Sequence, residues 1–294
     1  ANADSANTYT LTVGTGTYTL SLTGSGEDAN ATGDLDIAGD VIINGAGAGT
    51  TIVDGNAPDR VFQLLSSATA TLSDLTIQNG SLGGSGNGSG VYNDGDLTVN
   101  NSTVDSNVSA QRGGGIHSTG GMVDINSSTI INNSCSVVGG GVSAMTNAVV
   151  TIDSTVISSN NCNSGGGAVT AEGSNTITIT DSTLNSNVVT TQGSAIWNAG
   201  GDITIQGSTL SDNSGSPAIS AWGGGATTTI ENSTISGNNN GGMQVSFPSA
   251  VFTLRHVTVA NNTGTGIIVS SGTANLFSTI VANNSTADCN GTMT

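Results

Sequence analysis

The sequence predicts an all-β fold: a single-domain parallel β-helix, or solenoid, that coils through about 10–11 rungs. Three observations predict it. A nine-residue motif returns every 22–27 residues, apolar and polar residues alternate within each copy, and Gly or Asn separates the expected strands. Because each rung of a solenoid rests only on its neighbours, we expect one continuous domain.

The repeated motif ends on asparagine. Its first clear copy is Val99–Asn107, its last is Leu276–Asn284, and a weaker copy, Leu72–Gly80, lies one period upstream. At an inward bend, an Asn amide can bond to backbone groups and to the amide of the next rung, and Asn tolerates the left-handed conformation that such a bend requires. We therefore expect an internal Asn ladder, with a structural role. Its members are Asn107, Asn133, Asn160, Asn187, Asn213, Asn238, Asn262 and Asn284.

Strands are expected on either side of these bends. In one copy, Val123, Ile125 and Ile130 would point inward and Thr129 outward. A further segment such as Gly113–Ser118 follows each ladder Asn, which predicts three short strands per rung. Residues 1–80 repeat less clearly and predict irregular N-terminal rungs, whereas residues 81–294 predict regular ones.

The charge of the chain excludes several partners. It contains no Lys and only three Arg, and its net charge is −17. A nucleic-acid backbone requires clustered Lys and Arg, so we expect no nucleic-acid partner. No run of 18 apolar residues occurs, so we expect no insertion into a membrane.

Several segments resemble known bacterial surface proteins. Gly113–Ile116 and Val104–Asn107 are similar to repeats of polymorphic outer-membrane proteins, with Gly for Ala and an aliphatic residue for Phe. Residues 17–80 resemble secreted right-handed parallel β-helix proteins of the CSLREA type, although the CSLREA residues themselves are absent. Ser278–Gly291 resembles the start of a choice-of-anchor module. The resemblance implies a right-handed β-helix in an extracellular or cell-surface location, and it implies no reaction. The segments that carry the CSLREA resemblance are Tyr18–Ile37, Ile43–Asn56, Asp59–Leu64 and Asp74–Gly80.

Acidic residues provide the only candidate metal ligands. Glu27, Asp28, Asp34 and Asp36 are close in sequence, and they would either bind Ca²⁺ through carboxylate oxygens or remain solvated loop acids. Asp94 and Asp96 share a strand face as a similar pair, and the other acids fall mostly at different phases of the repeat. We therefore expect no catalytic residues and no cofactor apart from this calcium alternative.

The remaining candidates have ordinary interpretations. His117 and His256 are expected to be plain strand residues, and Arg60 to pair with the adjacent Asp59.

Two pairs of residues should come together if the rungs stack in phase. Cys135 and Cys162 each follow a ladder Asn by two residues, so they should be neighbours, either bonded as a disulfide or simply stacked. Trp197 and Trp222 are expected one rung apart at one phase, where they would bind a sugar ring or pack against strands.

Taken together, the sequence predicts a structural or adhesive extracellular rod, a monomeric stalk or a subunit that stacks end to end into a fibre. The expected partners are a second copy of the chain or surface glycans. Two alternatives remain: a β-helix that binds or cleaves polysaccharide, and a protein that binds ice or another crystal surface through outward threonines. The two threonine columns are Thr98, Thr151, Thr178, Thr204, Thr229 and Thr253, and Thr103, Thr129, Thr183, Thr209, Thr234 and Thr258.

Overall fold

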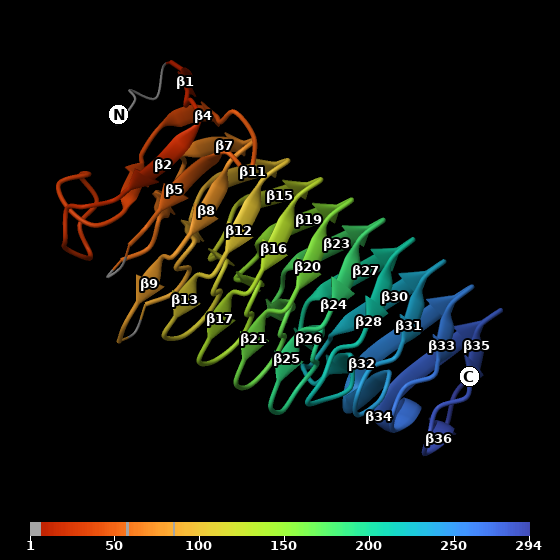
Figure 1. Ribbon diagram of the computed structural model, residues 1–294. Helices are drawn as coiled ribbons and strands as arrows, with labels where there is room; N and C mark the ends of the chain where they lie inside the picture. Colours follow the sequence, from red (N-terminus) through yellow and green to blue (C-terminus); the bar gives the residue numbers. More distant parts are fainter. Residues whose placement is uncertain (1–6, 57–58, 85) are drawn as a thin grey trace.

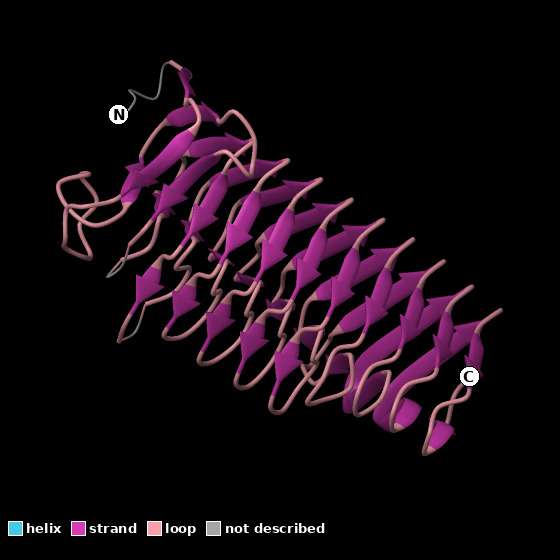
Figure 2. Cartoon of the chain, in the orientation of Figure 1, coloured by secondary structure: helices cyan, strands magenta, loops and turns pink. Residues whose placement is uncertain are grey.

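The chain winds into a rod of stacked strands. The structure, a computed structural model, describes residues 7–56, 59–84 and 86–294. β1 (Tyr9–Thr12) and β36 (Ala287–Asn290) lie at opposite ends of the rod (Figure 1). The described residues form strands, turns and loops but no helix (Figure 2), and hence no helix able to span a membrane. The predicted all-β parallel solenoid, of about ten rungs, is confirmed.

The largest of three parallel sheets has 20 described strands in two files. Two long strands, β32 (Met243–Arg255) and β34 (Thr265–Phe277), run through both files. The last strand, β36, pairs only with the first part of β34 and so extends the first file. The first file contains β3 (Leu35–Ile37), β6 (Phe62–Leu64), β10 (Val91–Asn93), β14 (Ile116–Ser118), β18 (Val142–Met145), β22 (Val169–Glu172), β26 (Ile196–Ala199) and β29 (Ile219–Ala221). The second contains β1, β4 (Asp40–Asn44), β7 (Thr69–Ser73), β11 (Asp96–Asn100), β15 (Met122–Asn126), β19 (Val149–Asp153), β23 (Thr176–Thr180), β27 (Asp202–Gln206) and β30 (Thr227–Glu231).

The second and third sheets have 11 and five described strands. The 11-stranded sheet contains β2 (Gly16–Thr19), β5 (Thr51–Asp54), β8 (Thr76–Gln78), β12 (Thr103–Asp105), β16 (Thr129–Ile131), β20 (Val156–Ser158), β24 (Thr183–Asn185), β28 (Thr209–Ser211), β31 (Thr234–Ser236), β33 (Thr258–Ala260) and β35 (Ile280–Ala282). The five-stranded sheet contains β9 (Ser81–Leu82), β13 (Val108–Ser109), β17 (Ser134–Cys135), β21 (Asn161–Cys162) and β25 (Val188–Val189).

The expected count of three strands per rung is too low in the middle of the rod. There, the two-residue strands β9 to β25 form a fourth file, because the segment after each ladder Asn is long enough to pair with its neighbour. Beyond β25 the rungs shorten, and single bridges such as Val188–Ser214 and Asn239–Thr263 take the place of this file.

Aliphatic side chains fill the interior in register. Val123, Ile125 and Ile130 are buried and Thr129 is partly exposed, as the alternation predicts. Ile125 pairs with Val99 on one side and with Ile152 on the other, so like side chains stack from rung to rung. Each fully buried side chain of this size contributes roughly 1.5–3 kcal/mol before conformational entropy is subtracted.

The predicted Asn ladder is confirmed, and its eight amides hydrogen-bond in one continuous file. Asn133 shows the pattern. Its Oδ1 accepts the backbone N–H of Asn107 at 3.0 Å and the Nδ2 of Asn107 at 2.9 Å. Its Nδ2 donates to Oδ1 of Asn160 at 3.0 Å and to the carbonyl of Val104 at 2.9 Å. A buried amide is thus fully satisfied without water.

The left-handed conformation lies one residue earlier than we expected. The ladder asparagines have ordinary negative φ, whereas the residue before each has positive φ, as at Ser106 (φ 56°) and Asn132 (φ 56°). The bend is therefore made by the preceding residue, and the ladder Asn is free to point its amide inward.

A second ladder, of hydroxyl groups, runs beside the first and was not predicted. The backbone N–H of Ser102 donates to Oγ of Ser128 at 3.2 Å, and that of Ser128 donates to Oγ1 of Thr155 at 3.2 Å. Each hydroxyl also donates to the carbonyl two residues before it, as Ser128 does to Asn126 at 2.8 Å. The Ser or Thr that recurs in the motif is the sequence feature from which this hydroxyl ladder could have been predicted. The members are Ser102, Ser128, Thr155, Ser182, Ser208 and Ser233.

Removing one amide from the middle of the Asn ladder should destabilise the rod. In Asn187→Ala, the backbone N–H and Nδ2 of Asn160 lose their shared acceptor, and the carbonyl of Ile157 loses a donor. We expect the free energy of unfolding, measured by urea denaturation, to fall by about 4 kcal/mol. The matched control, Asn239→Ala at an exposed position, should change it by less than about 0.5 kcal/mol. Equal losses in both variants would contradict the role given to the ladder.

Candidate functional site

The four acids expected to bind calcium lie near the N-terminal end of the rod, but the structure does not bring them together. Glu27 accepts backbone N–H groups of its own loop at 2.7 and 2.9 Å. Asp28 accepts Nε2 of Gln63 at 2.9 Å, and Asp36 accepts the backbone N–H of Asn30 at 2.9 Å. No group of three or more His, Cys, Asp or Glu side chains within residues 7–56, 59–84 and 86–294 is arranged to hold a metal ion.

The fourth acid, Asp34, is buried beside a second carboxylate, Asp59, which the sequence did not place with it. The Arg60 side chain reaches Asp34, with Nη1 3.3 Å from Oδ2. Among the described residues, Asp59 receives only the backbone N–H of Arg60, at 2.8 Å. The expected Arg60–Asp59 side-chain pair is therefore wrong. Arg60 also contacts Gln63 and lies over the ring of Tyr92, 5.1 Å from its centroid. Burial, followed by the charge of Asp59, raises the pKa of Asp34 to about 7.

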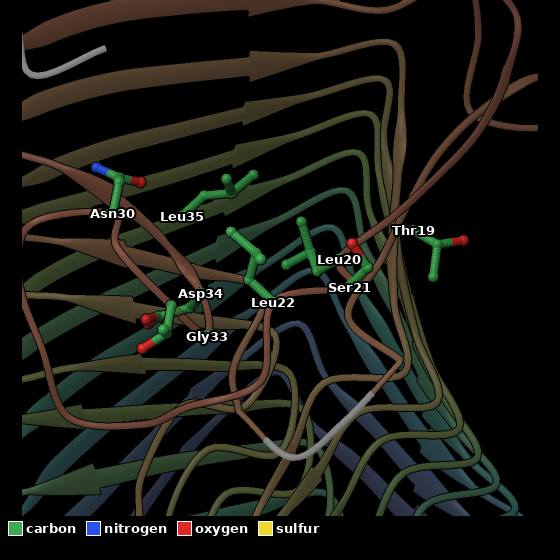
Figure 3. A pocket seen from close by; sticks show the side chains of 9 residues that line it. Thr19, Leu20, Ser21, Leu22, Asn30, Gly33, Asp34 and Leu35 are labelled. Atoms are coloured by element: carbon green, nitrogen blue, oxygen red, sulfur yellow. The ribbon is translucent and has the colours of Figure 1, made fainter.

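A small pocket opens beside the Asp34 carboxylate. Figure 3 shows Leu20, Leu22 and Leu35 around it, with Gly33 and Asp34 at its side. Its volume is about 240 Å³. The pocket lies at the N-terminal end of the rod, between the first rungs and the loop that links β2 to β3. Both polar and apolar residues line it.

His117 is a buried strand residue without a hydrogen-bond partner on either ring nitrogen in the described structure. It pairs with Tyr92 in the preceding strand, with ring centroids 5.7 Å apart, and with Ser143 in the next strand. Its placement in a strand agrees with expectation. The same expectation for His256 is wrong, because this residue lies in the bend before Val257, where it is exposed and has φ of 54°.

An ion pair lies across this part of the surface. Nε of Arg112 is 2.7 Å from Oε2 of Glu172, a residue two rungs away. Both side chains of this ion pair are half-buried, and the positive charge of Arg112 acts on His117. Burial, and then the positive charges of Arg112 and Arg60, lower the pKa of His117 to about 4. The imidazole is therefore neutral near pH 7.

The two tryptophans do not stack at one phase. Trp197 pairs in register with Ser220, so Trp222 lies two residues further along the next rung. Trp222 is 43% exposed, whereas the ring of Trp197 packs close to Gly165. The expectation that the two tryptophans share one phase is therefore wrong.

Cys135 and Cys162 form a disulfide that joins β17 to β21. They pair in register, with their Cα atoms 4.8 Å apart, inside the ordinary range for a disulfide. The bond links consecutive rungs within the five-stranded sheet. Cys289 is exposed, with a free thiol.

These rungs match a known family. The family model described as "Right handed beta helix region" matches residues 141–292, just over half of the chain. The chain belongs to the right-handed β-helix family. Searches of curated proteins and of solved structures found no match. The family match accords with the stacked parallel rungs and assigns no reaction.

The outward threonines of this right-handed β-helix form two files. Thr151, Thr178, Thr204, Thr229 and Thr253 pair directly with one another across five consecutive strands. Asp124 separates this run from Thr98. In the 11-stranded sheet, Val156 similarly separates Thr129 from Thr183. The first file is thus interrupted by an acid and the second by an aliphatic residue.

Removing the disulfide should weaken the middle of the rod. It closes a loop with a sequence separation of 27 residues, so the chain-entropy model predicts a loss of about 3–4 kcal/mol in Cys135→Ala/Cys162→Ala. Thermal unfolding with and without a phosphine reductant measures it. Cys289→Ser, which keeps the disulfide, is the control and should respond to reductant as the unmodified chain does. A Tm unaffected by reductant would contradict this stabilisation.

Acid should destabilise the protein partly through His117. The folded pKa is about 4 and the ordinary value is 6.5, so the unfolded chain binds a proton that the folded chain refuses. This contribution to stability is present above pH 6.5 and is lost as the pH falls toward 4. As the pH falls over that range, the free energy of unfolding of His117→Leu, measured by urea denaturation, should rise relative to that of the unmodified chain by up to about 3 kcal/mol. A difference that stays constant with pH would contradict the assignment.

Proposed function

We propose that this right-handed β-helix is a structural or adhesive rod that acts outside the cell or on its surface, without catalysis. The uninterrupted Asn ladder carries the proposal. It locks eight consecutive rungs in register, so the outward side chains form long, fixed files rather than a local pocket.

The extracellular location has separate support. The chain resembles secreted β-helix proteins of the CSLREA type and surface proteins with similar repeats. The Cys135–Cys162 disulfide favours an oxidising compartment. The net charge of −17 favours a soluble surface that avoids anionic partners.

Neutral glycans are the partners that these faces fit best. Threonine, serine and asparagine side chains line the outward files and can exchange hydrogen bonds with sugar hydroxyls. Acidic polysaccharides should be repelled, because 20 acidic residues face only three arginines.

Beads coated with the full chain test this proposal against a panel of neutral and acidic polysaccharides. We expect neutral polysaccharides to be retained at least threefold more than on beads carrying reduced, heat-denatured chain, with no release of new reducing ends. Retention should survive His117→Leu, which removes a buried titratable group. Cleavage of any polysaccharide, or equal retention by native and denatured beads, would contradict the adhesive rod.

The run of five directly stacked threonines favours a second candidate, binding to ice. A fixed spacing of about 4.8 Å between strands could order water at a crystal surface. Ice recrystallisation assays test it. Inhibition that is lost in Thr204→Tyr but kept in the exposed control Asn239→Tyr would support ice binding, and no inhibition by the unmodified chain would exclude it.

A further inference from the structure

Two buried carboxylates in the first rungs each keep one oxygen without a hydrogen bond. Asp34 and Asp59 are both 3% exposed. Oδ1 of Asp34 and Oδ2 of Asp59 have no partner in the described structure. An unpaired carboxylate oxygen is costly to bury, so two of them on neighbouring carboxylates call for a ligand or a proton.

Arg60 provides the partner of the other oxygen of each carboxylate, Oδ2 of Asp34 and Oδ1 of Asp59. Its Nη1 lies 3.3 Å from Oδ2 of Asp34, and its backbone N–H donates to Oδ1 of Asp59 at 2.8 Å. Its guanidinium also contacts Gln63 and the face of Tyr92. With both acids ionised, two negative charges meet one positive charge, and a buried excess of one negative charge remains.

The missing side chain of Gly33 lets the Asp59 carboxylate and the carbonyl oxygen of Gly24 approach the same point of the loop backbone. Gly33 has φ of +76°, and a Cβ added to it would lie 2.4 Å from Oδ2 of Asp59 and 2.9 Å from the carbonyl oxygen of Gly24. The Gly33 N–H donates to the carbonyl of Leu22 at 2.8 Å, which closes the loop over this point. The pocket of about 240 Å³ is lined by Gly33 and Asp34, so it opens beside the Asp34 side of this pair.

We propose that Asp34, Asp59 and the carbonyl oxygen of Gly24 bind one calcium ion, which fastens the loop between β2 and β3 to the first rungs. The available donors are carboxylate and carbonyl oxygens, without nitrogen or sulfur, the set that Ca²⁺ prefers in flexible sites completed by water. The site differs from the four clustered acids expected from the sequence: it keeps Asp34 and recruits Asp59 from the next rung. It does not depend on the adhesive role.

Calorimetric titration of the EDTA-treated full chain with CaCl₂ at pH 8 tests the site. We expect one ion per chain, and a Tm about 5 °C higher at a 100-fold excess over Kd than in EDTA. Asp34→Asn and Asp59→Asn should each weaken binding at least tenfold. Asp124→Asn, which removes one acid from a threonine file of the rod, is the matched control and should bind as the unmodified chain does.

The unmodified chain alone can overturn the proposal, even if a variant fails to fold. Absence of heat at millimolar CaCl₂, together with an identical Tm in calcium and in EDTA, would mean that no calcium binds and that a proton neutralises the pair. Binding that persists unchanged in both Asp34→Asn and Asp59→Asn would place the ion elsewhere and equally refute this site.

Discussion

Each ladder amide oxygen after that of Asn107 accepts two N–H groups from the rung before it, and the rest of the rod is arranged around this requirement. The spacing between ladder residues ranges from 27 down to 22, yet the amide-to-amide distances stay between 2.9 and 3.1 Å. Changes in rung length are therefore absorbed elsewhere, mainly after the ladder Asn, where the fourth file of strands disappears beyond β25.

Both ends of the ladder are closed by specific groups. At the C-terminal end, Oδ1 of Asp288 accepts the backbone N–H of Asn284 at 3.0 Å and its Nδ2 at 3.1 Å, as an amide of a further rung would. At the other end, Oδ1 of Asn107 accepts the backbone N–H of Gly80 at 2.9 Å. A side chain at Gly80 is excluded, because its Cβ would lie 2.0 Å from the carbonyl oxygen of Ser89. The ladder therefore starts at Asn107.

Much of the fold could be predicted from the sequence because stacking in register repeats the same physical demand in every rung. Eight asparagines at one phase, and aliphatic residues such as Ile125, record that demand directly. The hydroxyl ladder left the same kind of record, but Ser and Thr are so common in this chain that Ser128 did not stand out. Details that depend on one bend, such as the exposed turn position of His256, were not predicted because neighbouring positions of the motif carry similar polar residues.

The N-terminal site could be predicted only in part. Glu27, Asp28 and Asp36 are close to Asp34 in sequence, but hydrogen bonds direct each of them to a different partner. Asp59 is 25 residues from Asp34 and reaches it only because the chain returns after one rung. The repeat is too irregular in this region for its rungs to be aligned from the sequence, so Asp34 and Asp59 could not be placed together.

Hydrogen exchange of the Asn side-chain amides, followed by nuclear magnetic resonance, tests the central claim most directly. If the amides form one buried file, the Nδ2 protons of Asn133, Asn160 and Asn187 should exchange at least a thousandfold more slowly than those of the exposed Asn239. Exchange of the ladder amides as fast as that of Asn239 would show that they face solvent, and the stacked rod described above would be wrong.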